Sequence, residues 1–160
     1  MKNNIRSSNG FTLIELVVVI IILAILAVVA ASKFVNFRTD AIVSTMEGME
    51  TAMQSAATLT YSKAAIAGDE KLETTILDIG GVDVTLAYGY PDGTEAGIDL
   101  LMNVPEGDWQ KRRSTVYSGA WVYWHSQIEE DAGKAQCYLR YRQATSISAR
   151  PIIDVETSGC

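Results

Sequence analysis

One stretch near the N-terminus constrains this chain more than any other: an apolar run that extends from Phe11 to Ala31. About 20 apolar residues in a helix are enough to cross the hydrocarbon core of a bilayer. A single carboxylate, Glu15, lies near the start of this run. A charged side chain at bilayer depth costs roughly 2–4 kcal/mol. The carboxylate of Glu15 therefore needs a partner, and that partner is a clue to the function of the apolar run.

Two ordinary N-terminal segments fit only in part. A secretory signal has a shorter apolar core, and its small-residue cleavage site follows that core. Here the small polar residues Ser7 to Gly10 precede the run. A plain membrane anchor fits the length, and Lys2 and Arg6 would hold its N-terminus in the cytoplasm. Neither interpretation accounts for Glu15, or for the glycine directly before Phe11.

The residues at the start of the run resemble the prepilin cleavage and methylation motif of type IV pilins and type II secretion pseudopilins. They read Gly10-Phe11-Thr12-Leu13-Ile14-Glu15-Leu16. The resemblance implies that a prepilin peptidase cuts between Gly10 and Phe11 and that the new amino group of Phe11 is N-methylated. It also implies that Glu15 is the filament-assembly glutamate.

The assembly role of Glu15 has a physical basis. The new amine of Phe11 on a neighbouring subunit could lie near this carboxylate, and pairing two charges in a low dielectric is strongly specific for register. The alternative is that Glu15 only caps the N-terminus of its own helix, where acids are favoured.

The helix is expected to continue well beyond the apolar run. No proline interrupts residues 11–67, and Gly68-Asp69 is a suitable stop. Between them, apolar residues recur at helical spacing: Val35, Ile42, Met46, Met49, Met53 and Ala56. We interpret this stripe as core packing rather than an adaptable methionine-rich binding surface. Related type IV pilins often carry a proline where this chain has Ser32, so a kink or melted segment there is an open question.

The remaining residues predict strands separated by turns. Strands are expected over 76–79 and 82–90 around a Gly80-Gly81 hairpin turn, then over 120–126, 137–144 and 152–155, with a short helix over 94–102. The fold class is thus α+β: a long N-terminal helix packed on a small antiparallel sheet, as in the pilin fold. Three regions follow: a cleaved leader (1–10), a hydrophobic helix half (11–32), and an amphipathic helix half with a globular head (33–160).

The two cysteines, Cys137 and Cys160, are predicted to form a disulfide. An even pair behind an export-type N-terminus favours this, while two cysteines and one histidine are too few for a zinc site. Type IV pilins commonly close this region with a disulfide, whereas major pseudopilins usually rely on bound calcium. The alternative is two free or metal-binding thiols.

Catalytic chemistry is not expected. His125 is the only histidine, and we find no phosphate loop or metal motif, so we predict no catalytic residue, cofactor or metal. Cleavage would lower the net charge from −6 to −8, because the leader carries two cations and no acid. Such an acidic chain is a poor partner for nucleic acid.

Residues 111–113 (Lys-Arg-Arg) are interpreted as a solvated loop, or else as a partner for the acids of a neighbouring subunit at 129–131. Residues 121–124 (Trp-Val-Tyr-Trp) are interpreted as core, or else as a platform for a surface carbohydrate.

A second phrase extends the resemblance. Residues 81–91 (GVDVTLAYGYP) and 17–23 (VVVIIIL) are similar to stretches of mannose-sensitive haemagglutinin pilins, which are type IVa fibres of Gram-negative bacteria. The sequence thus predicts a major pilin: held in the inner membrane, processed by the peptidase and methylase, and polymerised with itself by the membrane assembly machinery into a surface fibre for adhesion and biofilm formation. A minor pilin, a pseudopilin and a single-pass membrane enzyme or sensor are the rivals.

Overall fold

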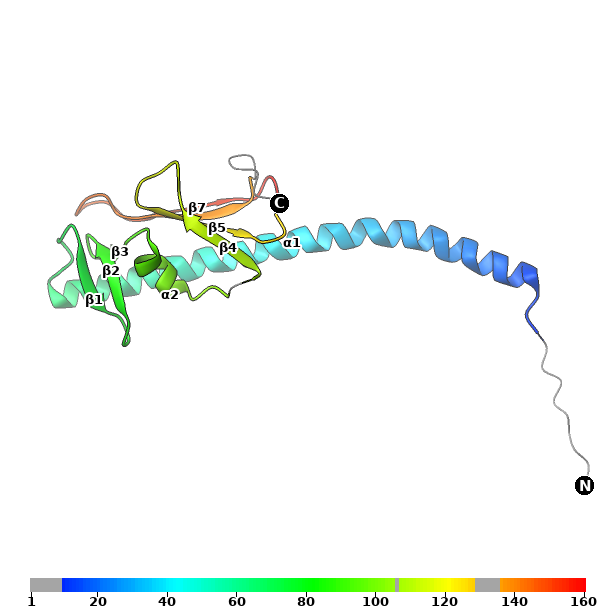
Figure 1. Ribbon diagram of the computed structural model, residues 1–160, viewed down its shortest axis with the longest axis horizontal. Helices are drawn as coiled ribbons and strands as arrows, with labels where there is room; N and C mark the ends of the chain where they lie inside the picture. Colours follow the sequence, from blue (N-terminus) through cyan, green and yellow to red (C-terminus); the bar gives the residue numbers. More distant parts are fainter. Residues whose placement is uncertain (1–9, 106, 129–135) are drawn as a thin grey trace, which may run out of the picture. The chain divides into compact units, whose positions relative to one another are not determined.

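A single helix, α1 (Leu13–Ala67), is followed by two antiparallel sheets in the computed structural model (Figure 1). The structure describes residues 10–105, 107–128 and 136–160, except for the side chains of residues 32–36. α1 continues through Ser32 without a break. The chain divides into two compact units, Met1–Asp40 and Ala41–Cys160. We call the second unit the head.

The described part of the first unit is the N-terminal end of α1. Its apolar side chains are exposed throughout, from Leu13 (79%) to Val29 (59%). The window Leu13–Ala31 has the length and composition to cross a membrane, and none of it is buried. Among the residues of this unit that the structure describes, none covers these side chains, so they require an apolar surrounding from elsewhere.

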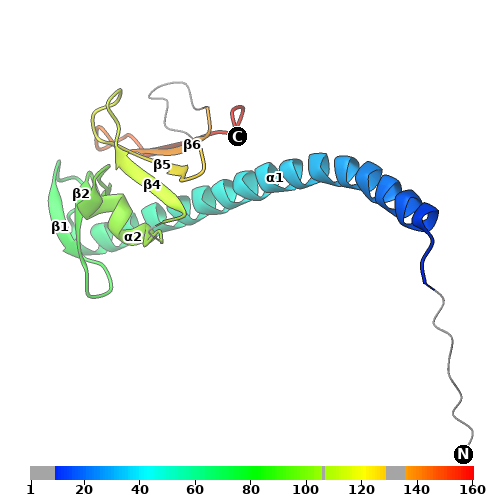
Figure 2. The ribbon, with the colours of Figure 1, turned by 45° about the vertical axis from the view of Figure 1, so that its right-hand side comes forward.

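The head contains the C-terminal part of α1 and both sheets (Figure 2). The first sheet is a meander of β1 (Thr75–Asp78), β2 (Asp83–Ala87) and β3 (Tyr90–Pro91). A π-helical turn, η1 (Glu95–Asp99), and a short helix, α2 (Leu100–Met102), follow. The second sheet runs in the order β4 (Trp109–Arg113), β5 (Ala120–His125), β6 (Tyr138–Arg142), β7 (Ile152–Glu156), with every neighbour antiparallel. The predicted α+β class is confirmed.

The main core lies between α1 and the inner face of the second sheet. Met46 and Met53 are fully buried against Tyr123, Leu139 and Tyr141. The methionine stripe is therefore core, because its four- and three-residue steps keep one face of the helix toward the sheet. A smaller core packs Ala64 against the first sheet.

Two sequence-based expectations about strands were wrong. Residues 82–90 do not form one strand: β2 ends at Ala87, and the chain turns back through Tyr88 and Gly89, both at positive φ, to pair Ala87 with Tyr90. Residues 111–113 are not a solvated loop, because they form most of β4 and pair with β5. The Gly80-Gly81 turn is as predicted, with both glycines at the positive φ that a tight hairpin requires.

Candidate processing and assembly site

The start of α1 is held by reciprocal hydrogen bonds between Thr12 and Glu15. The backbone N–H and the hydroxyl of Thr12 donate to Glu15 Oε2 at 2.9 and 2.8 Å, and the Glu15 N–H donates to Thr12 Oγ1 at 3.4 Å. Threonine before the first helical residue and glutamate three residues later form a capping box. The arrangement satisfies backbone donors that the first turn of any helix leaves unpaired.

Gly10 and Phe11 precede the helix and are fully accessible. Both are exposed, Phe11 by 93%, and neither is in a helix or strand. A peptidase needs an accessible bond outside helices and strands, and the peptide bond between these two residues meets that requirement. The structure thus places the three predicted site residues within six positions at one end of α1. The leader residues 1–9 lie outside the described part of the chain.

This site combines an accessible Gly–Phe bond, a capped glutamate and an exposed helix of membrane length. Residues 5–31 match the prokaryotic N-terminal methylation motif. The match supports a type IV pilin or pseudopilin-like component, and a structural protein rather than an enzyme. The motif and the apolar helix fit a membrane-anchored precursor, and the α+β head is consistent with a pilin fold. Comparisons with curated proteins and with solved structures gave no match.

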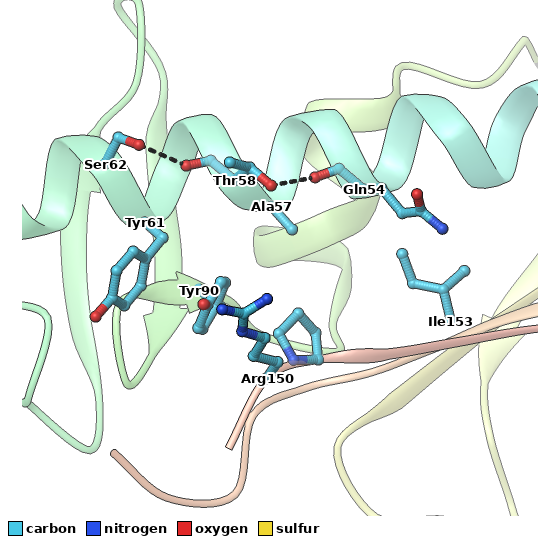
Figure 3. Close-up of a pocket in the computed structure, with 9 residues that line it drawn as sticks. Gln54, Ala57, Thr58, Tyr61, Ser62, Tyr90, Arg150 and Ile153 are labelled. Atoms are coloured by element: carbon cyan, nitrogen blue, oxygen red, sulfur yellow. Dashed lines mark hydrogen bonds between the residues drawn. The ribbon is translucent and has the colours of Figure 1, made fainter. Parts of the chain in front are cut away.

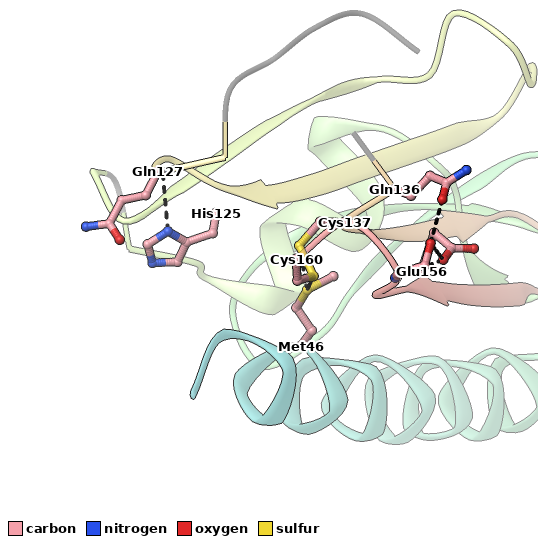
Figure 4. Close-up of a disulfide and its surroundings, with 8 residues drawn as sticks. Met46, His125, Gln127, Gln136, Cys137, Glu156 and Cys160 are labelled. Atoms are coloured by element: carbon pink, nitrogen blue, oxygen red, sulfur yellow. Dashed lines mark hydrogen bonds between the residues drawn. A yellow bond between two sulfur atoms is a disulfide. The ribbon is translucent and has the colours of Figure 1, made fainter. Parts of the chain in front are cut away.

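A disulfide joins Cys137 and Cys160 in the head (Figure 4). It lies against α1, where Met46 Sδ is 3.9 Å from Cys137 Sγ and 4.0 Å from Cys160 Sγ. Closing a loop of this length contributes about 3 kcal/mol in the chain-entropy model. Gln136 also holds the C-terminal end, because its carbonyl accepts the Gly159 N–H at 2.8 Å. The bond therefore fixes the C-terminus to both the sheet and the helix.

A buried carboxylate near the centre of the head is neutralised by Lys111. Asp99 is 4% exposed and accepts from Lys111 Nζ at 2.8 Å and from the Tyr123 hydroxyl at 3.0 Å. Burial and the adjacent Asp99 carboxylate raise the pKa of Tyr123 above its usual range. Sequence reasoning missed this network, since nothing in the local pattern links η1 with β4.

Among the described residues, Tyr123, Trp124 and the lone histidine form no open site. Tyr123 is fully buried and Trp124 is 9% exposed, so these rings do not make a sugar-stacking platform. The backbone N–H of Gln127 donates to Nδ1 of His125 at 3.3 Å, and the imidazole makes an edge contact with Trp109. The acids at 129–131, named as partners for residues 111–113, lie outside the described residues.

The capping box is the feature of the site that sequence reasoning only half found. The sequence-based alternative of Glu15 as a helix cap does not include its partner, Thr12. The signal was available, because Thr12-x-x-Glu15 before an apolar run is the sequence signature of the box.

Proposed function

We propose that the chain is the major pilin of a type IV pilus resembling the mannose-sensitive haemagglutinin type, a repeating subunit for surface attachment. One observation supports this proposal above the others: the motif Gly10–Glu15 leads into the 19-residue stretch Leu13–Ala31 of α1, in which no residue is buried. Such a helix is stable in lipid, and equally in a bundle of identical helices, because either surrounding removes its apolar side chains from water.

Processing would begin at the accessible bond between Gly10 and Phe11. Cleavage by a prepilin peptidase removes the basic leader, and N-methylation leaves a cationic secondary amine on Phe11. That amine then lies next to the capping box. In the lone subunit Glu15 is stabilised by Thr12, so the anchor can wait in the inner membrane without an unpaired carboxylate.

Assembly would give Glu15 a second partner, the Phe11 amine of a neighbouring subunit. Misalignment of two subunits would leave both charges unpaired in an apolar bundle, which is energetically costly. The charge pair therefore fixes the axial displacement between neighbouring subunits. Each subunit presents its amine and its carboxylate to different neighbours. A contact of this heterologous kind does not close, and it generates an open helical filament. The fibre would then leave the inner membrane through the pilus assembly machinery and reach the cell surface.

The Cys137–Cys160 disulfide favours a pilin over a pseudopilin. It closes the C-terminal region by a covalent bond, where a major pseudopilin usually relies on calcium. A minor pilin has the same processing but a low abundance, so it differs in quantity rather than in chemistry.

Mass spectrometry of filaments sheared from cells tests the proposal. We expect the dominant protein to be this chain, beginning at methylated Phe11 and lighter by two hydrogens from the closed disulfide. A chain that begins at Met1 would contradict the proposal. A correctly processed chain that is only a trace component of the fibre would make it a minor pilin.

The role of Glu15 needs a separate test. Glu15→Gln keeps an acceptor for the Thr12 hydrogen bonds but removes the charge, whereas Thr12→Val removes a hydroxyl of the cap and keeps the charge. We expect Glu15→Gln to reduce sheared fibre strongly and Thr12→Val to reduce it little. Equal, wild-type yields from both variants would rule out the charge pairing.

A further inference from the structure

A groove in the head lies between the C-terminal half of α1 and the segment that leads into β7 (Figure 3). Its volume is about 490 Å³, within the range of binding pockets. One wall is aromatic, because the rings of Tyr61 and Tyr90 stack with centroids 4.5 Å apart. The lining residues are Gln54, Ala57, Thr58, Tyr61, Ser62, Tyr90, Arg150, Pro151 and Ile153.

Arg150 supplies the only charge in this lining. It enters from the β7 side with its guanidinium directed toward α1 (Figure 3), and within the described residues it has no ion pair. The helix hydroxyls nearby are already committed as donors: Thr58 Oγ1 donates to the carbonyl of Gln54, and Ser62 Oγ to that of Thr58. The groove therefore offers a cation beside an aromatic pair and Pro151, which suits a carboxylate next to an apolar side chain.

The hairpin of β1 and β2 carries the opposite combination on its outer face. Asp78 lies directly opposite Asp83, and Ile76 lies directly opposite Thr85. Both aspartates are exposed, and Ile76 is 65% exposed. Like charges directly opposite each other destabilise a strand pair, and neither aspartate has an ion pair within the described part of the chain. This face lacks a cation and an apolar cover.

The hairpin and the groove of one head cannot meet. In Figures 1 and 2 the tip of the β1–β2 hairpin lies below α1, while the connection from β6 to β7, which contains Arg150, lies above it. All three side chains are exposed, so a cation for the two aspartates and a carboxylate for Arg150 can both come from another molecule. The chain carries both complementary surfaces, so a second copy could supply both.

We propose that the β1–β2 hairpin of one subunit docks in the Arg150 groove of a second copy of the chain. The carboxylate of Asp83 pairs with Arg150, and Ile76 packs on the aromatic and proline wall. The two surfaces differ, so the contact is heterologous and repeats without closing. This inference rests on the proposed fibre and names a head-to-head contact that the N-terminal helix does not provide.

Charge reversal tests the pairing in cells that express the full chain. Arg150→Glu and Asp83→Lys should each lower the sheared fibre about tenfold or more relative to the membrane pool, because each places like charges across the contact. The double variant, Arg150→Glu with Asp83→Lys, should recover to within about twofold of wild type. Asp83 is chosen because Asp78 also accepts the Gly81 N–H within its own turn. Lys63→Glu is the matched control, since it makes the same charge change on α1 outside the groove lining.

A cross-link tests the same contact without altering any charge. Ser62→Cys with Val82→Cys should give a ladder of disulfide-linked subunits from sheared fibres on a non-reducing gel. Ser62→Cys with Val116→Cys, which puts the second cysteine at another exposed valine, should give none.

The two proposals fail in different ways. Wild-type yields from both single charge reversals, a double variant no better than the singles, or equal ladders from both cysteine pairs would overturn the docking contact. The proposed pilin function would be unaffected by those results as long as wild-type cells make normal fibres of the methylated chain. Absence of this chain from wild-type fibres would instead overturn the proposed function.

Discussion

The two ends of α1 belong to one uninterrupted helix and yet have opposite surroundings. Between Leu13 and Ala31 no residue is buried, although nearly all are apolar. Beyond Ala41 only one face is apolar, and there Met46, Met53 and Ala64 are completely buried. The first segment depends on a partner from outside the chain, and the second finds its partner in the two sheets. The C-terminal segment of α1 thus has its packing partner within the head, whereas the N-terminal segment has an apolar surface that still needs one.

The strongest test of this contrast between the two segments of α1 is to replace one large apolar side chain by alanine in each of them. Met53→Ala should destabilise the head by about 2–5 kcal/mol, because it leaves a cavity in a closed core. Ile22→Ala should leave the head within about 0.5 kcal/mol of wild type, because Ile22 is exposed and belongs to the other compact unit. Urea unfolding in detergent, followed by tryptophan fluorescence, measures both, since Trp109, Trp121 and Trp124 all lie in the head. Equal losses would mean that the two segments are energetically alike.

The disulfide should matter only to the second segment. Replacing both cysteines, Cys137→Ser with Cys160→Ser, should cost the head about 3 kcal/mol through the lost loop closure. Limited proteolysis should then cut first near the C-terminus, while insertion of the N-terminal helix into membranes stays normal. Unchanged protease resistance would show that the hydrogen bonds at Gln136 suffice.

The buried ion pair is the next most sensitive part of the head. Lys111→Met keeps the side-chain stem but leaves Asp99 facing only the Tyr123 hydroxyl, so we expect a loss of about 2 kcal/mol. A double variant, Lys111→Met with Asp99→Leu, removes both charges and should recover most of that loss. If the single variant is as stable as wild type, the pair contributes nothing.

These contacts show which parts of the fold can be predicted from the sequence. The methionine stripe and the glycine turn were predictable, because helical spacing and positive φ are local properties. The turn at Tyr88 was not, since apolar and small residues alternate straight through it and a tyrosine rarely adopts positive φ. Strand β4 was hidden by its charges, and only the buried Asp99 explains why Lys111 belongs in a sheet.

The functional residues also divide into those that a local sequence pattern predicts and those that only the fold brings together. Gly10, Phe11 and Glu15 could be named because their spacing is a motif, and the Thr12 cap was encoded in the same six residues. The Arg150 groove could not be named, because it joins α1 to a segment nearly ninety residues later. Contacts of that range follow from the fold and have no local signal.

The smallest expected effect concerns a half-buried carboxylate. Burial raises the pKa of Asp92 above its ordinary value of 3.8, against the hydrogen bond from Thr94. Folded Asp92 therefore binds its proton more tightly than unfolded Asp92 does, and its ionised form costs stability. Asp92→Asn should stabilise the head at pH 7 by less than about 1 kcal/mol. The advantage should shrink as the pH falls through the raised pKa and vanish below 3.8, and an advantage that grows with acid would contradict this sign.

The position of the disulfide has a mechanical consequence for the edge strand β7. Among the described residues β7 pairs with β6 alone, and an edge strand that is joined to its neighbour at one end only can be peeled away one hydrogen bond at a time. Here the cysteines stand just before β6 and after β7, so the disulfide joins the two strands at one end and the chain joins them at the other. Shear on the head must then load the hydrogen bonds between β6 and β7 together, because the two strands are joined at both ends.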